Sequence, residues 1–452
     1  MLGLLNKKID LTEGPILKKL IIFTIPIFIG NLFQQFYNMS DALIVGNFAD
    51  NDAFAAVSST GSITFFLVGF FNGIGMGASV VVSRYVGAKD KDNIRNAIHT
   101  VFALGLVMSV IATIVGVAMT PFILKLMKTP ASVYPKSLMY LSIYFGGIIT
   151  VIVYNICMGI MRAYGDSTSP LYYLIISSLL NIVLDLLFVG VFKWDVAGAA
   201  VATVISQGVS CALCIRRMTH LTDETRLSLK DIKFHNYILK DAIIIGLPTG
   251  LQNSIISIGN MVVQTNINSF GPFAMSGQGA YAKIEGFVFL PITCMSMALT
   301  TFISQNLGAK AYDRAKKAAF QGTLLSVILA QLIGVIILLN TETFLRIFIS
   351  EPEAIKYGII HTRITAWFYV LVAFSHCASG ILRGCGKSIV PMLTMLAFWC
   401  IIRVLYVTIT ISYIPKFQVI SWAYPITWTL SSIVFIIILL FMDWVHGLEK
   451  KI

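Results

Sequence analysis

Long apolar segments with very few charged residues recur along the whole of this 452-residue chain. Crossing the hydrocarbon core of a bilayer takes about 20 helical residues, and about a dozen segments reach that length. They are too long and too continuously apolar for the short alternating strands of a membrane barrel. We therefore predict an all-α integral membrane protein with twelve transmembrane helices, near residues 16–45, 53–81, 96–120, 134–161, 169–191, 196–217, 241–269, 274–304, 316–340, 355–381, 388–412 and 419–443.

Composition and charge placement support this interpretation. Hydrophobic residues make up 57% of the chain, charged residues make up 12%, and the net charge is +12. Lys and Arg gather in alternate loops, which predicts that both termini lie in the cytoplasm. Because this topology and anionic lipid account for the positive charge, the lipid bilayer is an expected partner and nucleic acid is not.

An internal repeat divides the chain into two halves. SRYVGAKDKDNIRNA begins at residue 83, and the similar SQNLGAKAYDRAKKA begins at residue 304, an offset of 221 residues. At the same offset, GIMRAYGDSTSP at 159–170 matches GILRGCGKSIVP at 380–391. Since six helices are an even number, two six-helix lobes keep one orientation and enclose a central cavity suited to alternating access. We predict lobes at 1–218 and 241–452, joined by a cytoplasmic linker at 219–240.

In these features the chain resembles the multidrug and toxic compound extrusion (MATE) transporters over almost its whole length. The resemblance depends on the span count, the paired S-x-x-x-G-A-K segments and the paired G-x-x-R-x-x-G-x-S-x-x-P segments. It also depends on Pro26 and Pro248 near the start of each lobe, and on LDLLFVGVFKWDVAGAAVATVIS at 184–206. The resemblance implies a multi-pass secondary antiporter of the bacterial plasma membrane that exports bulky cationic or amphipathic organic compounds in exchange for H⁺ or Na⁺.

Two short motifs have structural explanations. The G-x-x-x-G-x-x-x-G run at Gly69, Gly73 and Gly77 lacks the Lys-Ser/Thr of a phosphate loop, so it predicts close helix packing. Cys211 and Cys214 form a lone C-x-x-C without a second pair, which favours packing over a metal or redox site. No H-E-x-x-H and no acid-rich metal motif is present, so we expect no enzyme and no cofactor besides the coupling ion.

Two acidic residues interrupt the apolar helices of the first lobe. A carboxylate at the centre of a spanning helix costs about 2.5 to 3.5 kcal/mol on insertion, so Asp185 requires a partner, a proton or an ion. Asn181 lies one turn before Asp185 and shares its helix face. A polar stripe along the first helix should face the bundle interior, because lipid disfavours it; it consists of Asn31, Gln34, Asn38 and Asp41.

These acids and Thr203 of the sixth helix lie at a similar depth in the membrane. We predict a cation-coupling cluster made up of Asp41, Asn181, Asp185 and Thr203. Its oxygen atoms suit shared protons, or Na⁺ as a bound metal if the protein is sodium-coupled. The resemblance implies the same cluster, since similar transporters place an acid late in the first helix, Asn-x-x-x-Asp in the fifth and Thr in the sixth. A hydrogen-bonded clamp between these helices is the structural alternative.

The second lobe does not repeat this chemistry. The repeat partners of Asp41 and Asp185 are Val263 and Tyr406, so only the first lobe is expected to carry the coupling site. Polar and adaptable side chains of both lobes are expected to bind a small-molecule drug or metabolite, with the protein acting as a monomer. The predicted substrate cavity is lined by Gln34, Tyr37, Asn38, Asn253, Ser257, Asn260, Met261 and Glu285.

Three intramembrane groups of the second lobe leave alternatives open. Glu285 could pair with Arg403, or it could face the substrate. His376 could be a core histidine or a proton relay. A flippase for a lipid-linked saccharide is the alternative function, but it should hold several cavity cations to bind a pyrophosphate, and only Lys283 and Arg403 are candidates.

Overall fold

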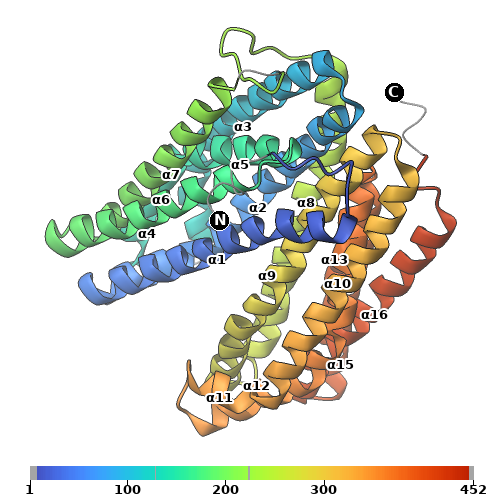
Figure 1. Ribbon diagram of the computed structural model, residues 1–452. Helices are drawn as coiled ribbons and strands as arrows, with labels where there is room; N and C mark the ends of the chain where they lie inside the picture. Colours follow the sequence, from blue (N-terminus) through green and yellow to red (C-terminus); the bar gives the residue numbers. More distant parts are fainter. Residues whose placement is uncertain (1–7, 128, 222–223, 447–452) are drawn as a thin grey trace. The chain divides into compact units, whose positions relative to one another are not determined.

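Helices make up the regular structure of this protein (Figure 1). The computed structural model describes residues 8–127, 129–221 and 224–446, and no strand occurs in these ranges. Within them, eleven helices are long and apolar enough to span a membrane. A bent pair, α4 (Tyr134–Gly146) and α5 (Ile148–Ala163), meets at 46° and brings the number of spans to twelve. The predicted all-α membrane architecture is therefore confirmed.

The first compact unit contains residues 25–250 and the segment up to Asp10. At its centre α5 packs against α2, α3 and α7, and its apolar side chains are almost completely buried. Phe145 and Ile148, on either side of the α4–α5 bend, have no exposed surface. The remaining helices of this unit are α2 (Asn51–Ala88), α3 (Lys91–Leu126), α6 (Thr168–Asp185) and α7 (Asp195–Thr219), with most of α1 (Ile16–Phe48) and the start of α8 (Asn236–Asn268).

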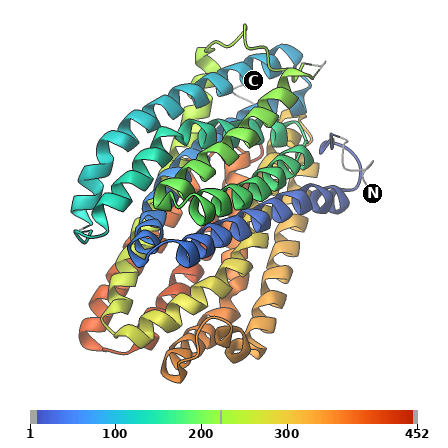
Figure 2. The same ribbon diagram turned by 90° about the vertical axis from the view of Figure 1, so that its left-hand side faces the viewer.

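The second compact unit contains residues 11–24 and 251–452. Its central helix is α13 (Tyr369–Gly384), which packs against α9, α10 and α16 in the views of Figures 1 and 2. The other helices are α9 (Pro272–Gly308), α10 (Tyr312–Leu339), α11 (Thr341–Arg346), α12 (Pro352–Thr365), α14 (Ile389–Met395), α15 (Arg403–Tyr413) and α16 (Phe417–Phe441).

The boundaries between the two units lie inside helices α1 and α8. The sequence analysis, in contrast, predicts a single boundary in the linker at 219–240. In α1 the assignment changes between Thr24 and Ile25, next to Pro26, and in α8 it changes after Gly250, close to Pro248. An internal proline removes one helical hydrogen bond and bends the helix, so both changes coincide with a weak point of the backbone. The linker and the first part of α8 thus pack with the first unit.

The predicted close packing at the glycine run is confirmed within the first unit. A Cβ on Gly73 would lie 2.4 Å from the Cα of Gly250, and a Cβ on Gly77 would lie 2.2 Å from the Cα of Gly246. Glycine is therefore required at these crossings, because any side chain would separate α2 from α8.

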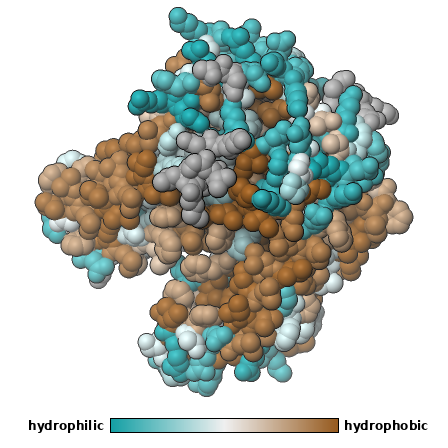
Figure 3. Space-filling view, in the orientation of Figure 1, coloured by the Kyte–Doolittle hydropathy of each residue, from teal (hydrophilic) through white to brown (hydrophobic). Residues whose placement is uncertain are grey.

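The linker is attached to the charged end of α3. The amide of Ser228 donates to Nε2 of His99 (3.0 Å), Tyr237 donates to Asn93 (2.6 Å), and Arg95 pairs with Asp231. Away from the charged helix ends, the outer faces of the helices expose many large apolar side chains. Figure 3 shows hydrophobic residues over most of the visible helix flanks, with hydrophilic residues near the ends and loops. Lipid is the solvent that suits these flanks.

Candidate functional site

The four residues of the predicted cation-coupling cluster are all buried inside the first unit. Asp41 lies in the last third of α1 and is 8% exposed, while Asn181 and Asp185 of α6 have no exposed surface. Thr203 lies two turns into α7 and is also buried. The hydrophobic core of this unit, which includes Ile44 and Val45 of the same end of α1, isolates these polar groups from lipid.

The structure brings the two carboxyl groups together. Asp41 and Asp185 face each other closely enough to interact electrostatically. Apart from this contact between the two carboxyl groups, Oδ1 of Asp41 and both carboxyl oxygens of Asp185 have no hydrogen-bond partner within the described residues. Both amide atoms of Asn181 also lack one among the described residues, and the hydroxyl of Thr203 has only Tyr37 beside it. So many unsatisfied polar atoms in one buried place are unfavourable unless a proton or a cation completes the cluster.

The backbone changes form directly after Asp185. Residues Leu186–Val191 continue α6 as a π-helical segment, and the corresponding helix of the second unit contains another at Leu396–Ile402. Wide turns of this kind are rare and occur often at functional sites, because they free backbone groups and displace the following side chains. In α6, the π-helical segment Leu186–Val191 lets the helix change its shape directly beside the carboxyl group of Asp185.

Two tyrosines lie near the carboxyl pair, and a third packs against one of them. Tyr37 of α1, predicted as a cavity residue, lies beside Thr203 and within electrostatic range of both acids. Tyr140 of α4 is within the same range and packs against Tyr144 with ring centroids 6.3 Å apart. The sequence analysis missed Tyr140 and Tyr144, although their i, i+4 spacing on an apolar helix was a usable signal.

The donor set fits either of the two predicted ions. Asp41, Asp185, the amide oxygen of Asn181 and the hydroxyl of Thr203 offer hard oxygen ligands of the kind that Na⁺ accepts. Two facing carboxyls can also share a proton. The described residues contain no group of three or more His, Cys, Asp or Glu side chains able to hold a metal ion.

Glu285 and Arg403 lie within electrostatic range of each other, but their hydrogen bonds go to other side chains. Glu285 accepts a hydrogen bond from Tyr281 (2.8 Å). Arg403 donates to Thr427 through Nε (3.2 Å) and Nη2 (2.9 Å), and its guanidinium lies 4.5 Å from the ring centroid of Tyr424. A hydroxyl and an aromatic face contact the buried cation directly, and Glu285 acts on it only through the longer-range electrostatic interaction. The spacing of charges along the sequence does not reveal these direct contacts.

Two histidines lie in helices α12 and α13 of the same unit. His376 packs its ring against Phe289 and Trp399, at centroid distances of 5.7 and 5.4 Å, and its Nε2 has no hydrogen-bond partner among the described residues. His361, which the sequence analysis did not single out, is fully buried and its Nδ1 lies 3.0 Å from the hydroxyl of Ser421. Aromatic packing supports the core interpretation of His376.

The predicted substrate-cavity residues are divided between the two units. Gln34 is exposed on α1, and the side chain of Asn38 lies outside the described residues. On the part of α8 that belongs to the second unit, Asn260 and Met261 are exposed. Asn253 and Ser257 are half-buried, and the hydroxyl of Ser257 donates to the backbone of Asn253 (3.0 Å). Their part in substrate binding stays a prediction.

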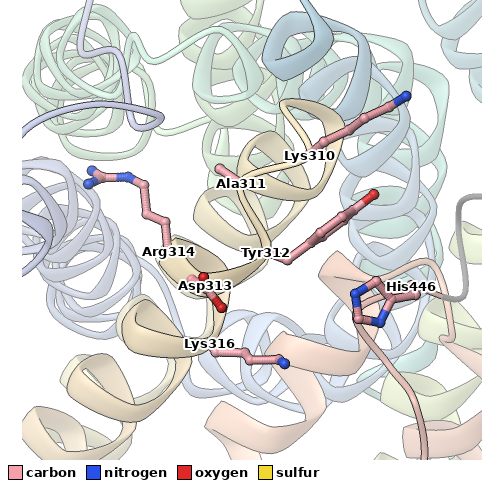
Figure 4. Close-up of a pocket in the computed structure, with 7 residues that line it drawn as sticks. All are labelled: Lys310, Ala311, Tyr312, Asp313, Arg314, Lys316 and His446. Atoms are coloured by element: carbon pink, nitrogen blue, oxygen red, sulfur yellow. The ribbon is translucent and has the colours of Figure 1, made fainter.

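An open recess of about 420 Å³ lies at the turn between α9 and α10 (Figure 4). Its cationic side chains do not converge, because Lys310, Arg314 and Lys316 point in different directions. Arg314 donates to the backbone carbonyls of Leu11 and Gly14, so it anchors the segment before α1. We assign the recess no role in binding.

Comparisons with known proteins agree with this geometry. The family model described as MatE matches the chain twice, at residues 26–187 and 248–409, which confirms the internal repeat. The "Probable multidrug resistance protein YpnP" of Bacillus subtilis is 29% identical over 407 residues, covering 87% of this chain and 88% of that protein. The "Multidrug export protein MepA" of Staphylococcus saprophyticus is 23% identical and covers 83% of each chain. Among solved structures, "Crystal structure of MATE in the bent conformation" superposes with a TM-score of 0.91 over 99% of both chains, at 22% identity.

Proposed function

Because the chain belongs to the MatE family of multidrug efflux transporters, we propose that it is a secondary antiporter that exports bulky cationic or amphipathic organic compounds in exchange for H⁺ or Na⁺. It is a multi-pass membrane transporter and not an enzyme. We place it in the bacterial plasma membrane, as a monomer with both termini in the cytoplasm. The distribution of Lys and Arg along the sequence supports this orientation.

One observation carries the proposal of ion coupling. Asp41 and Asp185 are buried face to face and, apart from the contact between them, three of their four carboxyl oxygens lack a hydrogen-bond partner within the described residues. Two neighbouring carboxylates in a low-dielectric environment repel each other, and one proton or cation relieves that repulsion. The cluster therefore has two forms of different charge, which is the requirement for an ion-driven switch.

The two forms of the cluster favour different arrangements of the helices around it. When the ion is bound, α1 and α6 can approach because the carboxyl groups no longer repel each other, and when it leaves, the repulsion moves them apart. An ion that binds one conformation more tightly shifts the protein toward that conformation. By the same linkage, a substrate that prefers the other conformation weakens ion binding, so export and ion entry are coupled.

We favour H⁺ as the coupling ion. Two facing carboxyl groups can share one proton without further ligands. Sodium would also need the Asn181 oxygen and the Thr203 hydroxyl as ligands, and the four side chains would then replace most of its water shell. Both ions act on the same cluster, so a substitution of either acid is expected to abolish coupling in each case.

The proposal is tested by substrate efflux from proteoliposomes with an imposed pH or Na⁺ gradient. The wild-type protein should expel an organic cation faster with a gradient than without one. Asp41→Asn and Asp185→Asn should insert and purify normally, because they remove a buried charge, but should show no gradient-driven efflux. Wild-type rates in both variants would refute the assignment of the cluster.

A further inference from the structure

A cluster of three charged residues joins the parts of the first unit that also carry the coupling cluster. Nζ of Lys136 contacts Oδ2 of Asp50 and Oδ2 of Asp195 in two ion pairs. Asp50 lies between α1 and α2, Lys136 in the first turn of α4, and Asp195 at the start of α7. We call these three residues the distal clasp, because Asp50 follows the end of α1 that is remote from the N-terminus.

The distal clasp and the coupling cluster share their supporting elements. Asp41 precedes Asp50 by nine residues, and Thr203 follows Asp195 by eight. Tyr140 follows Lys136 by one helical turn, about 6 Å along α4. Each clasp residue thus lies within about two and a half turns of a residue that belongs to the coupling cluster (Asp41, Thr203) or lies beside it (Tyr140), so a change at the clasp reaches the cluster along these helices.

The geometry of the clasp indicates positioning. Lys136 is the most protected of the three, with 24% of its side chain exposed, whereas the Asp50 side chain is 62% exposed. Ion pairs this exposed contribute little to folding stability. An ammonium with three donors can nevertheless hold two carboxylates in fixed directions. Asp195 has a left-handed φ of 55°, a conformation that aspartate adopts more readily than most non-glycine residues.

The clasp also fixes the end of α1. Asp50 accepts the amide of Ala53 (2.8 Å) as the N-cap of α2, so the corner between α1 and α2 moves as one piece. Just before this corner, the ring of Phe48 packs beside Gly190, and Lys193 lies over it at 5.6 Å. Losing the ion pair to Lys136 would leave mainly these apolar contacts at the end of α1.

The ionisation of Asp50 keeps the clasp closed during transport. Hydrogen bonds from Lys136 and from the amide of Ala53 lower the pKa of Asp50 below its ordinary value of 3.8. The contribution of Asp50 to the clasp is therefore complete above pH 3.8, the ordinary pKa of the group. It is lost only as the pH falls through the lowered pKa that Asp50 has in the folded protein. Coupling that responds to pH near neutrality does not arise from Asp50.

We propose that Lys136 is a positioning residue of the coupling cluster: by holding the distal end of α1 against α4 and α7, it keeps Asp41 facing Asp185. This inference rests on the function proposed above. Without Lys136 the end of α1 moves away, Asp41 spends less time opposite Asp185, and the cluster binds its ion more weakly. The maximal rate at saturating ion is unchanged, because the acids themselves remain.

The test compares Lys136→Gln, Lys136→Arg and Lys125→Gln with the wild type in proteoliposomes. Efflux of an organic cation is measured against the imposed H⁺ or Na⁺ concentration. Lys136→Gln should raise the half-saturating ion concentration at least about fivefold with little loss of maximal rate. Lys136→Arg should restore most of the affinity, since it keeps the charge. Lys125 is an exposed lysine near the end of α3, and its substitution controls for the loss of one surface charge.

The possible outcomes separate this inference from the proposed function. Absence of ion dependence in the wild type, or wild-type efflux by Asp185→Asn, would refute the proposed function. With ion dependence intact, an unchanged half-saturation in Lys136→Gln, or an equal shift in Lys125→Gln, would overturn the role of Lys136. Asp195→Asn breaks only one arm of the clasp, so it should fold even if Lys136→Gln does not; it should give a smaller shift in the same direction, and no shift would overturn the inference.

Discussion

The crossing of α2 and α8 gives a prediction whose size follows from the coordinates. In Gly77→Ala, the new Cβ would lie 2.2 Å from the Cα and the amide nitrogen of Gly246. Carbon atoms are comfortable at about 3.5 to 4.0 Å, so the helices must separate by about 1.5 Å. Overpacking of this kind costs about 1 to 3 kcal/mol. The contacted atoms are backbone and cannot rotate away, which places the cost at the upper end.

A matched control lies in the same helix. A Cβ on Gly61 would meet no atom within 4 Å, so Gly61→Ala should be neutral, or stabilising by up to about 1 kcal/mol because alanine favours helix. Purified variants can be heated in detergent and the folded fraction followed by size-exclusion chromatography. By soluble-protein scaling, Gly77→Ala should lower the midpoint by roughly 2 to 12 °C relative to Gly61→Ala. Equal midpoints would refute the described close approach of α2 and α8.

Two further predictions concern other parts of the chain. Burial, together with the charges of Lys233 and His99, lowers the pKa of His235 below its ordinary value of 6.5. The folded protein therefore disfavours the protonated ring. The attachment of the linker to α3 is strongest above pH 6.5 and weakens as the pH falls below it. Limited proteolysis of the linker should accelerate between pH 8 and pH 5 in the wild type but not in His235→Gln, and equal acceleration in both would contradict this. Arg403→Lys cannot donate to Thr427 in the same way and should lower stability by about 1 to 3 kcal/mol, measured by thermal unfolding, while Lys356→Arg at the surface should not.

The fold was predictable to a large extent because membrane helices are encoded by continuous hydrophobicity. The spans, the repeat and the burial of Asp41 and Asp185 all follow from the cost of placing polar groups in lipid. The bend at Gly147 was not predicted, since an apolar run gives no sign of a bend. The division of α1 and α8 between the compact units also depends on packing with distant segments, which the local sequence does not record.

The candidate site was predictable in its two acids and in the polar residues Asn181 and Thr203, which share a helix face or a membrane depth with them. An acid in an apolar helix is conspicuous because it is costly, so Asp185 could be found without a structure. Tyr140 could not be assigned in the same way, since a tyrosine in an apolar helix is common and its hydroxyl acquires a role only through neighbours on other helices. Glu285 and Arg403 show the converse, because opposite charges suggested a pair where the structure uses Tyr281 and Thr427.

The most direct test of the central claim is to count the ions released when substrate binds. Purified protein in weakly buffered detergent solution is mixed with an exported organic cation, and the released H⁺ or Na⁺ is measured. The wild type should release ions in proportion to substrate bound, and Asp41→Asn and Asp185→Asn should release none. Undiminished release from both variants would contradict the assignment of ion binding to the buried carboxyl pair.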